Sequence, residues 1–284
     1  MNKRIFISST ILIVALLLSS CGFQIVTGSG NVVTETRDVS TFSRITLAGI
    51  GDVYVTQGAG TSVRIEAEDN LIPYFETAVH GNTLTISIKD EYMGVNLHPL
   101  KPVKFYVTTP KIEAVTLAGS GNIIVGDILT TGFNVSLLGS GDISTGKLTA
   151  TNVDVKLAGS GNISLGTVSA TEVTANIAGS GNIGIETVTA DKVSSTTSGS
   201  GDITISGEVT EQHIVILGSG DYLASGLKSE NATVRTAGSG NSQVSATGTL
   251  DVTILGSGDV VYSGSPRMNV SVSGSGRVNQ STQP

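Results

Sequence analysis

The feature of this 284-residue chain that most constrains its fold is the tripeptide Gly-Ser-Gly, which recurs along most of its length. From Gly119 onward the copies follow one another at a nearly constant interval, and nine of the ten copies are followed by Asn or Asp. The ten copies begin at Gly28, Gly119, Gly139, Gly159, Gly179, Gly199, Gly218, Gly238, Gly256 and Gly274. A constant period of this length is typical of solenoids, because one short repeat cannot bury its own apolar face and must stack on the next.

Between two copies of the motif, apolar residues alternate with polar ones, which predicts short strands with one buried face. Apolar residues coincide when the repeats are aligned at a spacing of 20, as in the row Ile123, Ile143, Ile163, Ile183 and Ile203. Like residues would then stack at the strand spacing of about 4.8 Å. We therefore expect an all-β chain, a right-handed parallel β-helix (β-solenoid) of coils about 20 residues long. An antiparallel β-meander or sandwich of the same strands is the alternative.

The motif also explains the glycine content, since it contains 20 of the 36 glycines. We expect its glycines to form corners with positive φ, a conformation in which a Cβ would clash. The Asn or Asp that follows tolerates the same turn and can stack with its equivalents in a ladder. A motif used ten times predicts a turn and argues against a catalytic role, which needs a single constellation of residues.

The repeat is interrupted between Gly49 and Gly119, an interval more than three times the usual one, and Gly49-Ile50-Gly51-Asp52 is a degenerate copy. Alternating stretches at 52–56, 63–67, 83–89 and 103–108 predict antiparallel strands that are inserted here and cap the N-terminal end. A cap is expected because an open solenoid end presents unpaired strand groups. If the segment instead forms a recognition surface, its candidate binding residues are Glu68, Asp69, Tyr74, His80 and His98.

The N-terminus has the features of an export signal: Lys3 and Arg4 precede an apolar run at 11–18. Leu18-Ser19-Ser20-Cys21 resembles the lipobox of bacterial lipoproteins, which implies cleavage before Cys21 and a lipid on that residue. The expected divisions are a signal peptide at 1–20, the lipidated Cys and a short linker at 21–27, the first part of the domain with its strand insertion at 28–118, the repeat solenoid at 119–278 and a polar tail at 279–284. We expect a cell-envelope protein anchored in the membrane by this lipid, in the outer membrane, on either its periplasmic or its surface face.

Composition excludes several classes of function. Cys21 is the only cysteine and there are three histidines, which leaves little material for a metal site. A net charge of −7 argues against nucleic acid as a partner, because phosphate binding needs clustered Lys and Arg. We expect no catalytic residues, no metal and no cofactor.

Three stretches, GSGNVVTETRDV at 28–39, GDVYVTQG at 51–58 and EAEDNLIPY at 66–74, strongly resemble the head GIN domain family of auto-transporter adhesins. The later Gly-Ser-Gly-Asn/Asp repeats and the closing Gly264-Ser265-Pro266 also resemble that family, so the likeness runs from residue 28 to about 278. It implies a β-rich, largely parallel helical fold and a secreted or lipid-anchored envelope location, and it brings no catalytic residues.

These observations predict a noncatalytic envelope lipoprotein whose solenoid is an adhesion or binding module for a glycan or an envelope protein. One alternative is a polysaccharide lyase or hydrolase, since paired carboxylates such as Glu68 and Asp69 can act on glycosidic bonds. Another is a structural or envelope-stress accessory protein.

Overall fold

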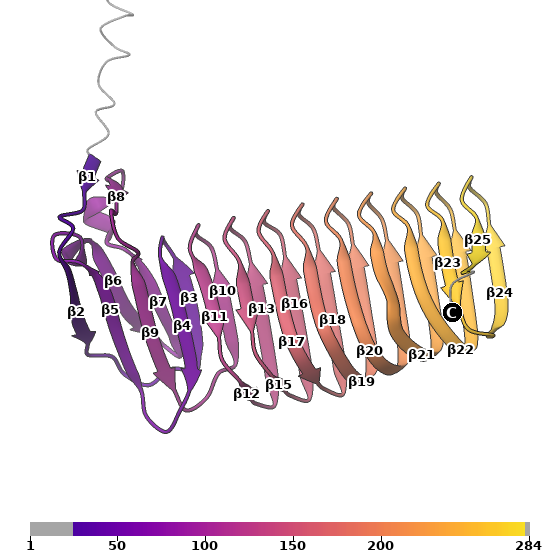
Figure 1. Ribbon diagram of the computed structural model, residues 1–284, viewed down its shortest axis with the longest axis horizontal. Coiled ribbons are helices and arrows are strands. Elements are labelled where there is room, and N and C mark those ends of the chain that lie inside the picture. Colours follow the sequence, from indigo (N-terminus) through magenta and orange to yellow (C-terminus); the bar gives the residue numbers. More distant parts are fainter. Residues whose placement is uncertain (1–24, 282–284) are drawn as a thin grey trace, which may run out of the picture.

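The computed structural model describes residues 25–281, which form an N-terminal cap followed by a long solenoid (Figure 1). The described residues are almost entirely strands and turns, with two short 3-10 helices, η1 (Ile72–Tyr74) and η2 (Asp90–Tyr92). The expected signal peptide and Cys21 lie outside this part of the chain. No helix within 25–281 is long and apolar enough to span a membrane.

The cap is defined here as residues 25–113. Its strands are β1 (Ile25–Thr27), β2 (Val32–Arg37), β3 (Arg44–Ala48), β4 (Asp52–Gln57), β5 (Ser62–Glu68), β6 (Phe75–His80), β7 (Thr83–Ile88), β8 (Asn96–His98) and β9 (Lys104–Thr109). The antiparallel pairs β2–β5, β5–β9 and β6–β7 confirm the predicted strand insertion. β1 pairs with β8, so the last residues of the predicted linker belong to a small sheet.

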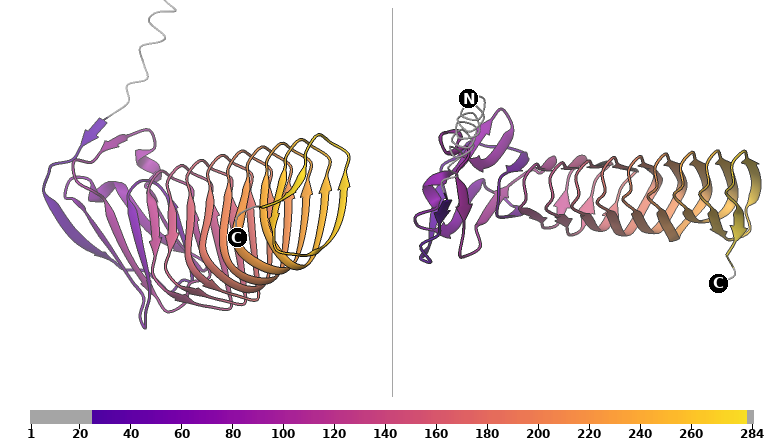
Figure 2. Two further views of the ribbon diagram at one scale, coloured as in Figure 1. Left: turned by 45° about the vertical axis from the view of Figure 1, so that its right-hand side comes forward. Right: turned by 90° about the horizontal axis from the view of Figure 1, so that it is seen from above.

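The solenoid is defined as residues 114–281. Its strands are β10 (Ala114–Leu117), β11 (Asn122–Val125), β12 (Ile128–Leu129), β13 (Gly132–Leu137), β14 (Ile143–Thr145), β15 (Leu148–Thr149), β16 (Asn152–Leu157), β17 (Ile163–Ser169), β18 (Glu172–Ile177), β19 (Ile183–Thr197), β20 (Ile203–Ile216), β21 (Tyr222–Thr236), β22 (Ser242–Ile254), β23 (Val260–Ser263), β24 (Arg267–Val272) and β25 (Val278–Gln280). The coils follow one another in single file, and the two ends of the described chain lie at opposite ends of the molecule (Figures 1 and 2).

Strand pairing in the solenoid confirms the β-solenoid and shows that the antiparallel alternative is wrong. All the pairs that β10 to β25 make are parallel, and equivalent residues of successive coils face each other. The predicted isoleucine row is in register from Ile123 to Ile203 and is buried throughout. The register between successive coils shifts at β-bulges in β19 to β22, where the spacing of the motif departs from 20 residues. The bulges accommodate these small changes in coil length.

The solenoid begins on a coil that the cap itself supplies. β3 pairs with β10 and β4 pairs with β11, both parallel and in register. A Cβ on Gly119 would meet the backbone of Gly49, and one on Gly121 would meet Gly51. The degenerate motif at 49–52 is therefore the first rung of the stack, which begins before the boundary at 119 that the sequence suggested.

The expected reason for the motif glycines, positive φ, holds for Gly30 of the first copy but is wrong for the copies from Gly119 onward. Positive φ occurs among the described glycines at Gly30, Gly51, Gly81, Gly94, Gly207 and Gly264, and the motif glycines from Gly119 onward are absent from that set. Each motif glycine from Gly119 onward lies directly over its equivalent in the preceding coil. A Cβ there would overlap the carbonyl oxygen of that equivalent, as for Gly161 over Gly141. Glycine is required because the backbones stack closely.

The predicted ladder is present. The side-chain oxygen of each motif Asn or Asp in the solenoid accepts a hydrogen bond from the backbone N–H of its equivalent in the next coil, as Asn182 Oδ1 does from Asp202 N (2.9 Å). Asn side chains also donate down the stack, as Asn162 Nδ2 does to Asp142 Oδ1 (3.1 Å). Asn and Asp can both occupy a position in the ladder, because each has a side-chain oxygen that accepts this hydrogen bond.

Inside the later coils, polar side chains replace some of the aliphatic ones. The Tyr222 hydroxyl donates to Gln212 Oε1 (3.3 Å), and Gln212 Nε2 donates to Ser229 Oγ (2.8 Å). All three side chains are buried. Burial raises the pKa of Tyr222 well above its ordinary value, because the ionised phenol would lose its hydration.

The C-terminal coil is open within the described chain. Met268, Val270 and Val272 of β24 continue the rows of the core but are 37%, 43% and 44% exposed. β25, which takes up the start of the predicted polar tail, pairs with β23. The cap thus covers one end of the stack, and the other end presents the edge of its last strands.

Candidate functional site: the outer face of the cap and first coils

Of the five predicted binding residues, Glu68 is fully buried. Its Oε1 accepts the N–H of Gly30 (2.6 Å), and its Oε2 accepts those of Leu100 (2.9 Å) and Lys101 (3.3 Å). A Cβ at Gly28 would overlap the same carboxylate. Glu68 therefore holds the first Gly-Ser-Gly copy against the 99–101 loop, and both of its oxygens are already engaged.

Asp69 and His98 are exposed and lie beside this buried carboxylate. Asp69 accepts hydrogen bonds from Ser29 Oγ and from Asn31 Nδ2 (2.8 Å). Both bonds stabilise the ionised carboxylate and so lower the pKa of Asp69, and the bond from Ser29 has the larger effect. The backbone carbonyl of His98 accepts the N–H of Gly28 (3.0 Å). The first motif copy is thus bound to the cap and takes no part in the solenoid stack.

Tyr74 and His80 belong to other places on the cap. The Tyr74 ring packs on Tyr92 with centroids 4.5 Å apart, in the region of the two 3-10 helices. His80 is the last residue of β6, about 16 Å along the strand from Phe75, its first residue. The structure therefore brings Glu68, Asp69 and His98 together and leaves His80 apart from them.

A different surface, which the sequence did not single out, runs across the cap and onto the coils. On its outer side, Tyr54 of β4 and Tyr106 of β9 are paired in register, and their rings stack with centroids 5.4 Å apart at 18°. The guanidinium of Arg64 on β5 lies 4.2 Å from the centroid of Tyr106. We call Arg64, Tyr106 and Tyr54 the aromatic wall. The alternation of buried and outward residues in each strand indicates that these three side chains point outward. It does not indicate that they are neighbours, because that depends on pairing between strands distant in the sequence.

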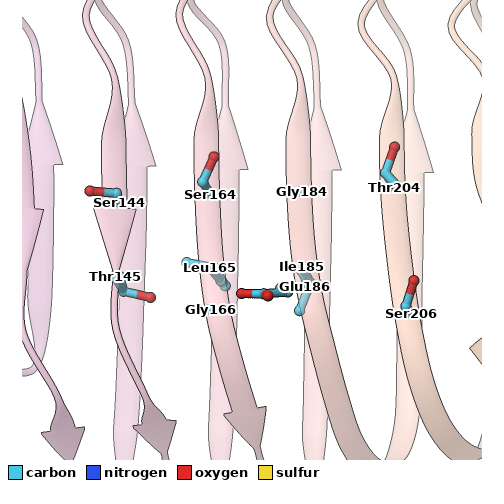
Figure 3. Close-up of a pocket in the computed structure, with 10 residues that line it drawn as sticks. All are labelled: Ser144, Thr145, Ser164, Leu165, Gly166, Gly184, Ile185, Glu186, Thr204 and Ser206. Atoms are coloured by element: carbon cyan, nitrogen blue, oxygen red, sulfur yellow. The ribbon is translucent and has the colours of Figure 1, made fainter.

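The outward row continues from the wall along the solenoid. Tyr54 is in register with Ile124, and the following positions are Ser144, Ser164, Gly184, Thr204 and Leu223. Because four successive positions carry small side chains, the face is hollowed there into a shallow trough of about 480 Å³ (Figure 3). Its lining residues are Ser144, Thr145, Ser164, Leu165, Gly166, Gly184, Ile185, Glu186, Thr204 and Ser206.

The Asn/Asp ladder borders this trough. Each rung lies just before the start of a trough strand and two positions before the trough residue, with a buried isoleucine between them, so rung and trough residue are on the same outer face. Asn162 precedes Ser164 in this way, and Asn182 precedes Gly184. Rungs such as Asn162 and Asn182 are exposed at their outer side. The trough is thus flanked by a regular line of amide and carboxylate groups.

The surface offers hydrogen-bonding groups and apolar ring surface. Within residues 25–281, no group of three His, Cys, Asp or Glu side chains is placed to hold a metal ion. Hydroxyl, amide and carboxylate groups spaced by one coil can bind a polar ligand along the solenoid axis.

Fold and surface together define a class: a β-solenoid of stacked coils with an antiparallel strand cap and an extended polar outer face. The family model described as "Putative auto-transporter adhesin, head GIN domain" matches residues 41–183 and 164–266. The chain belongs to this family. No curated protein gave a match.

Solved structures share this architecture. A "putative lipid binding protein" from Parabacteroides distasonis is 27% identical, with a TM-score of 0.70 over 91% of this chain and all of its own. A "putative adhesin" from the same organism is 24% identical, with a TM-score of 0.70 and the same coverage. A "putative adhesin" from Parabacteroides merdae is 23% identical, with a TM-score of 0.62 over 91% of this chain and all of its own. The last two support the fold.

Proposed function

We propose that this protein is a noncatalytic cell-envelope lipoprotein whose solenoid is an adhesion or binding module for a glycan or an envelope protein. The observation that supports this most directly is the outer face, where a wall of two tyrosines and an arginine lies in the same outward row as a polar trough along the coils, with Ile124 between them. Membership of an adhesin-type family supports a binding role at the cell envelope.

The test is binding by the mature chain, residues 21–284, to panels of glycans, purified envelope proteins and phospholipid vesicles. Vesicles are included because one similar protein is described as lipid binding. We expect saturable binding in the glycan or protein panel with no change in the covalent structure of the bound molecule. Binding in neither panel, or release of shortened or unsaturated saccharides, would contradict the proposal.

The proposed anchor is tested separately. Cys21→Ala removes the thiol that would carry the lipid, so the variant should accumulate as an unprocessed or soluble exported protein. Cell fractionation and the mass of the N-terminal peptide report the result. A variant that still fractionates with membranes as the parent does would show that the anchor assignment is wrong. Lipid on Cys21 would join the cap end of the molecule to the membrane, in the outer membrane by our proposal.

A further inference from the structure

We propose that the trough binds an uncharged glycan chain, with one end of the chain against the aromatic wall. This rests on the proposed binding function and names the site and the ligand class. The trough runs from Ser144 to Thr204, across four adjacent coils, and so is about 14 Å long at the strand spacing. That length accommodates a short run of sugar units.

The wall provides the apolar contact that sugar rings require. Tyr106 covers one face of Tyr54, and Ile124 follows Tyr54 in the row, so the outer surface changes at Ser144 from large side chains to small ones. Both tyrosines are partly exposed, and within the described chain neither hydroxyl makes a hydrogen bond. Because Arg64 and Tyr54 lie on either side of Tyr106, the wall meets a ligand with ring edges and hydroxyls, which offer apolar contact and hydrogen bonds.

The trough and the ladder provide the polar contacts. Ser164 and Thr204 are exposed on the trough floor. Each ladder residue uses one side-chain oxygen for the next coil, which leaves the second carboxylate oxygen or an amide hydrogen facing outward. These groups repeat at about 4.8 Å, which is comparable to the length of one sugar unit. A polyhydroxylated chain can therefore meet equivalent groups at each step.

The acidic residues of this surface favour an uncharged glycan as the ligand. Glu186 is the charged residue of the trough, and the ladder beside it includes Asp142 and Asp202. The cation of the wall, Arg64, already lies over Tyr106. A sulfated or uronate-rich polysaccharide would place its anions against these acids, which costs free energy. The net charge of −7 disfavours such a ligand at longer range as well.

The experiment uses the position in the trough where a Cβ can be added without a clash. A Cβ on Gly184 would meet nothing within 4 Å, and the same is true of Gly132, which lies at the start of β13 on another side of the coil. Gly184→Phe fills the trough, and Gly132→Phe is the matched control. Tyr54→Ala removes part of the wall. Circular dichroism and the denaturant midpoint verify that each variant is folded.

Binding is measured by affinity electrophoresis and calorimetry with galactomannan and soluble β-glucan as uncharged probes, and with alginate and heparin as anionic ones. We expect the parent chain and Gly132→Phe to bind an uncharged probe equally. Gly184→Phe and Tyr54→Ala should each weaken that binding about tenfold or more. The anionic probes should not bind.

Three outcomes overturn the inference: unchanged binding by Gly184→Phe, preference of the parent chain for the anionic probes, or no binding to an uncharged probe. If the parent chain still binds an envelope protein or another glycan in the panels described above, the proposed function survives without this site. If it binds nothing there, both proposals fail.

Discussion

The cap and the solenoid solve the same problem, the burial of a narrow β core, in different ways. In the solenoid, equivalent residues stack in register, so every position faces the equivalent position of the next coil and side-chain size is limited by that neighbour. In the cap, strands of different sequence pair in both directions, and six of the twelve aromatic residues lie within 50–118. Repetition gives the solenoid regular rows of small polar groups, and large side chains such as Tyr54 and Tyr106 occur where repetition stops.

The two regions also use glycine differently. The motif glycines of the solenoid provide space, because a Cβ would overlap the coil below. Gly81, at the tip of the β6–β7 hairpin, has open space around it and a φ of +61°. It provides a backbone conformation that other residues adopt at a cost. Substitutions can therefore separate the two roles.

The largest expected effect is that of Gly161→Ala in the middle of the stack. The added methyl would overlap Gly141 O, and the coils above and below leave no room for it to move. We expect a loss of about 3 kcal/mol or more in the free energy of unfolding, measured with denaturant. Gly132→Ala is the control and should be neutral or slightly stabilising. Equal stabilities for the two variants would refute close stacking as the reason for the motif.

Gly81 sharpens this contrast. Gly81→Asn should cost less than about 1 kcal/mol, since Asn tolerates positive φ. Gly161→Asn should be at least as damaging as Gly161→Ala, because the limit there is space. The same denaturant titrations give both values. A Gly81→Asn variant as unstable as Gly161→Asn would mean that one explanation covers both glycines.

In the cap, the next largest effect is expected for Glu68→Gln. An amide of the same shape offers one accepting oxygen in place of two and turns an N–H toward backbone donors, so we expect a loss of about 2–4 kcal/mol. Hydrogen exchange at Gly30 and Leu100 should accelerate while the coils stay protected.

Glu66→Gln is the matched control for Glu68. Its carboxylate is partly exposed and lies 3.6 Å from Lys104 Nζ, so its loss should change stability by less than about 1 kcal/mol. If the two glutamate variants behave alike, the clamp assigned to Glu68 does not hold the first motif copy.

The smallest effect separates the polar interior of the later coils from the partly exposed tyrosines of the cap. The unfolded chain releases the Tyr222 proton near pH 10, whereas burial keeps it bound in the folded chain, so stability falls as pH rises above about 10. Tyr222→Phe should remove this part of the fall. Unfolding midpoints at pH 8 and pH 11 measure it, and an identical fall in both proteins would contradict the assignment.

Much of the solenoid could be predicted because its period is constant. Aligning the repeats at that period placed Ile123 over Ile143, and the structure pairs them. The cap was predictable to the level of strands: the stretch 103–108 corresponds to β9 (Lys104–Thr109). Its pairing was not predictable, because β4 and β9 are far apart in the sequence and no repeat sets their register. The same separation concealed the wall, since Tyr54 and Tyr106 become neighbours through that pairing.

Glycine marks the limit of sequence reasoning here. A lone Gly is compatible with a left-handed turn or with close contact, and the two were distinguished by the carbonyl beneath it. Glu68 was misleading for a related reason. A carboxylate in a polar stretch suggests an exposed ligand, and its burial depends on backbone donors from two segments that are distant in the sequence, one before it and one after it.

The stacking of coils has a consequence for the evolution of length. Each coil satisfies the backbone of the one before it and presents the same groups to the one after it, so a duplicated coil can be inserted without disturbing its neighbours. Every inserted coil would carry the far end about 4.8 Å further from the cap. The reach of such a protein can therefore be graded in fixed increments while the cap and the wall beside it stay unchanged.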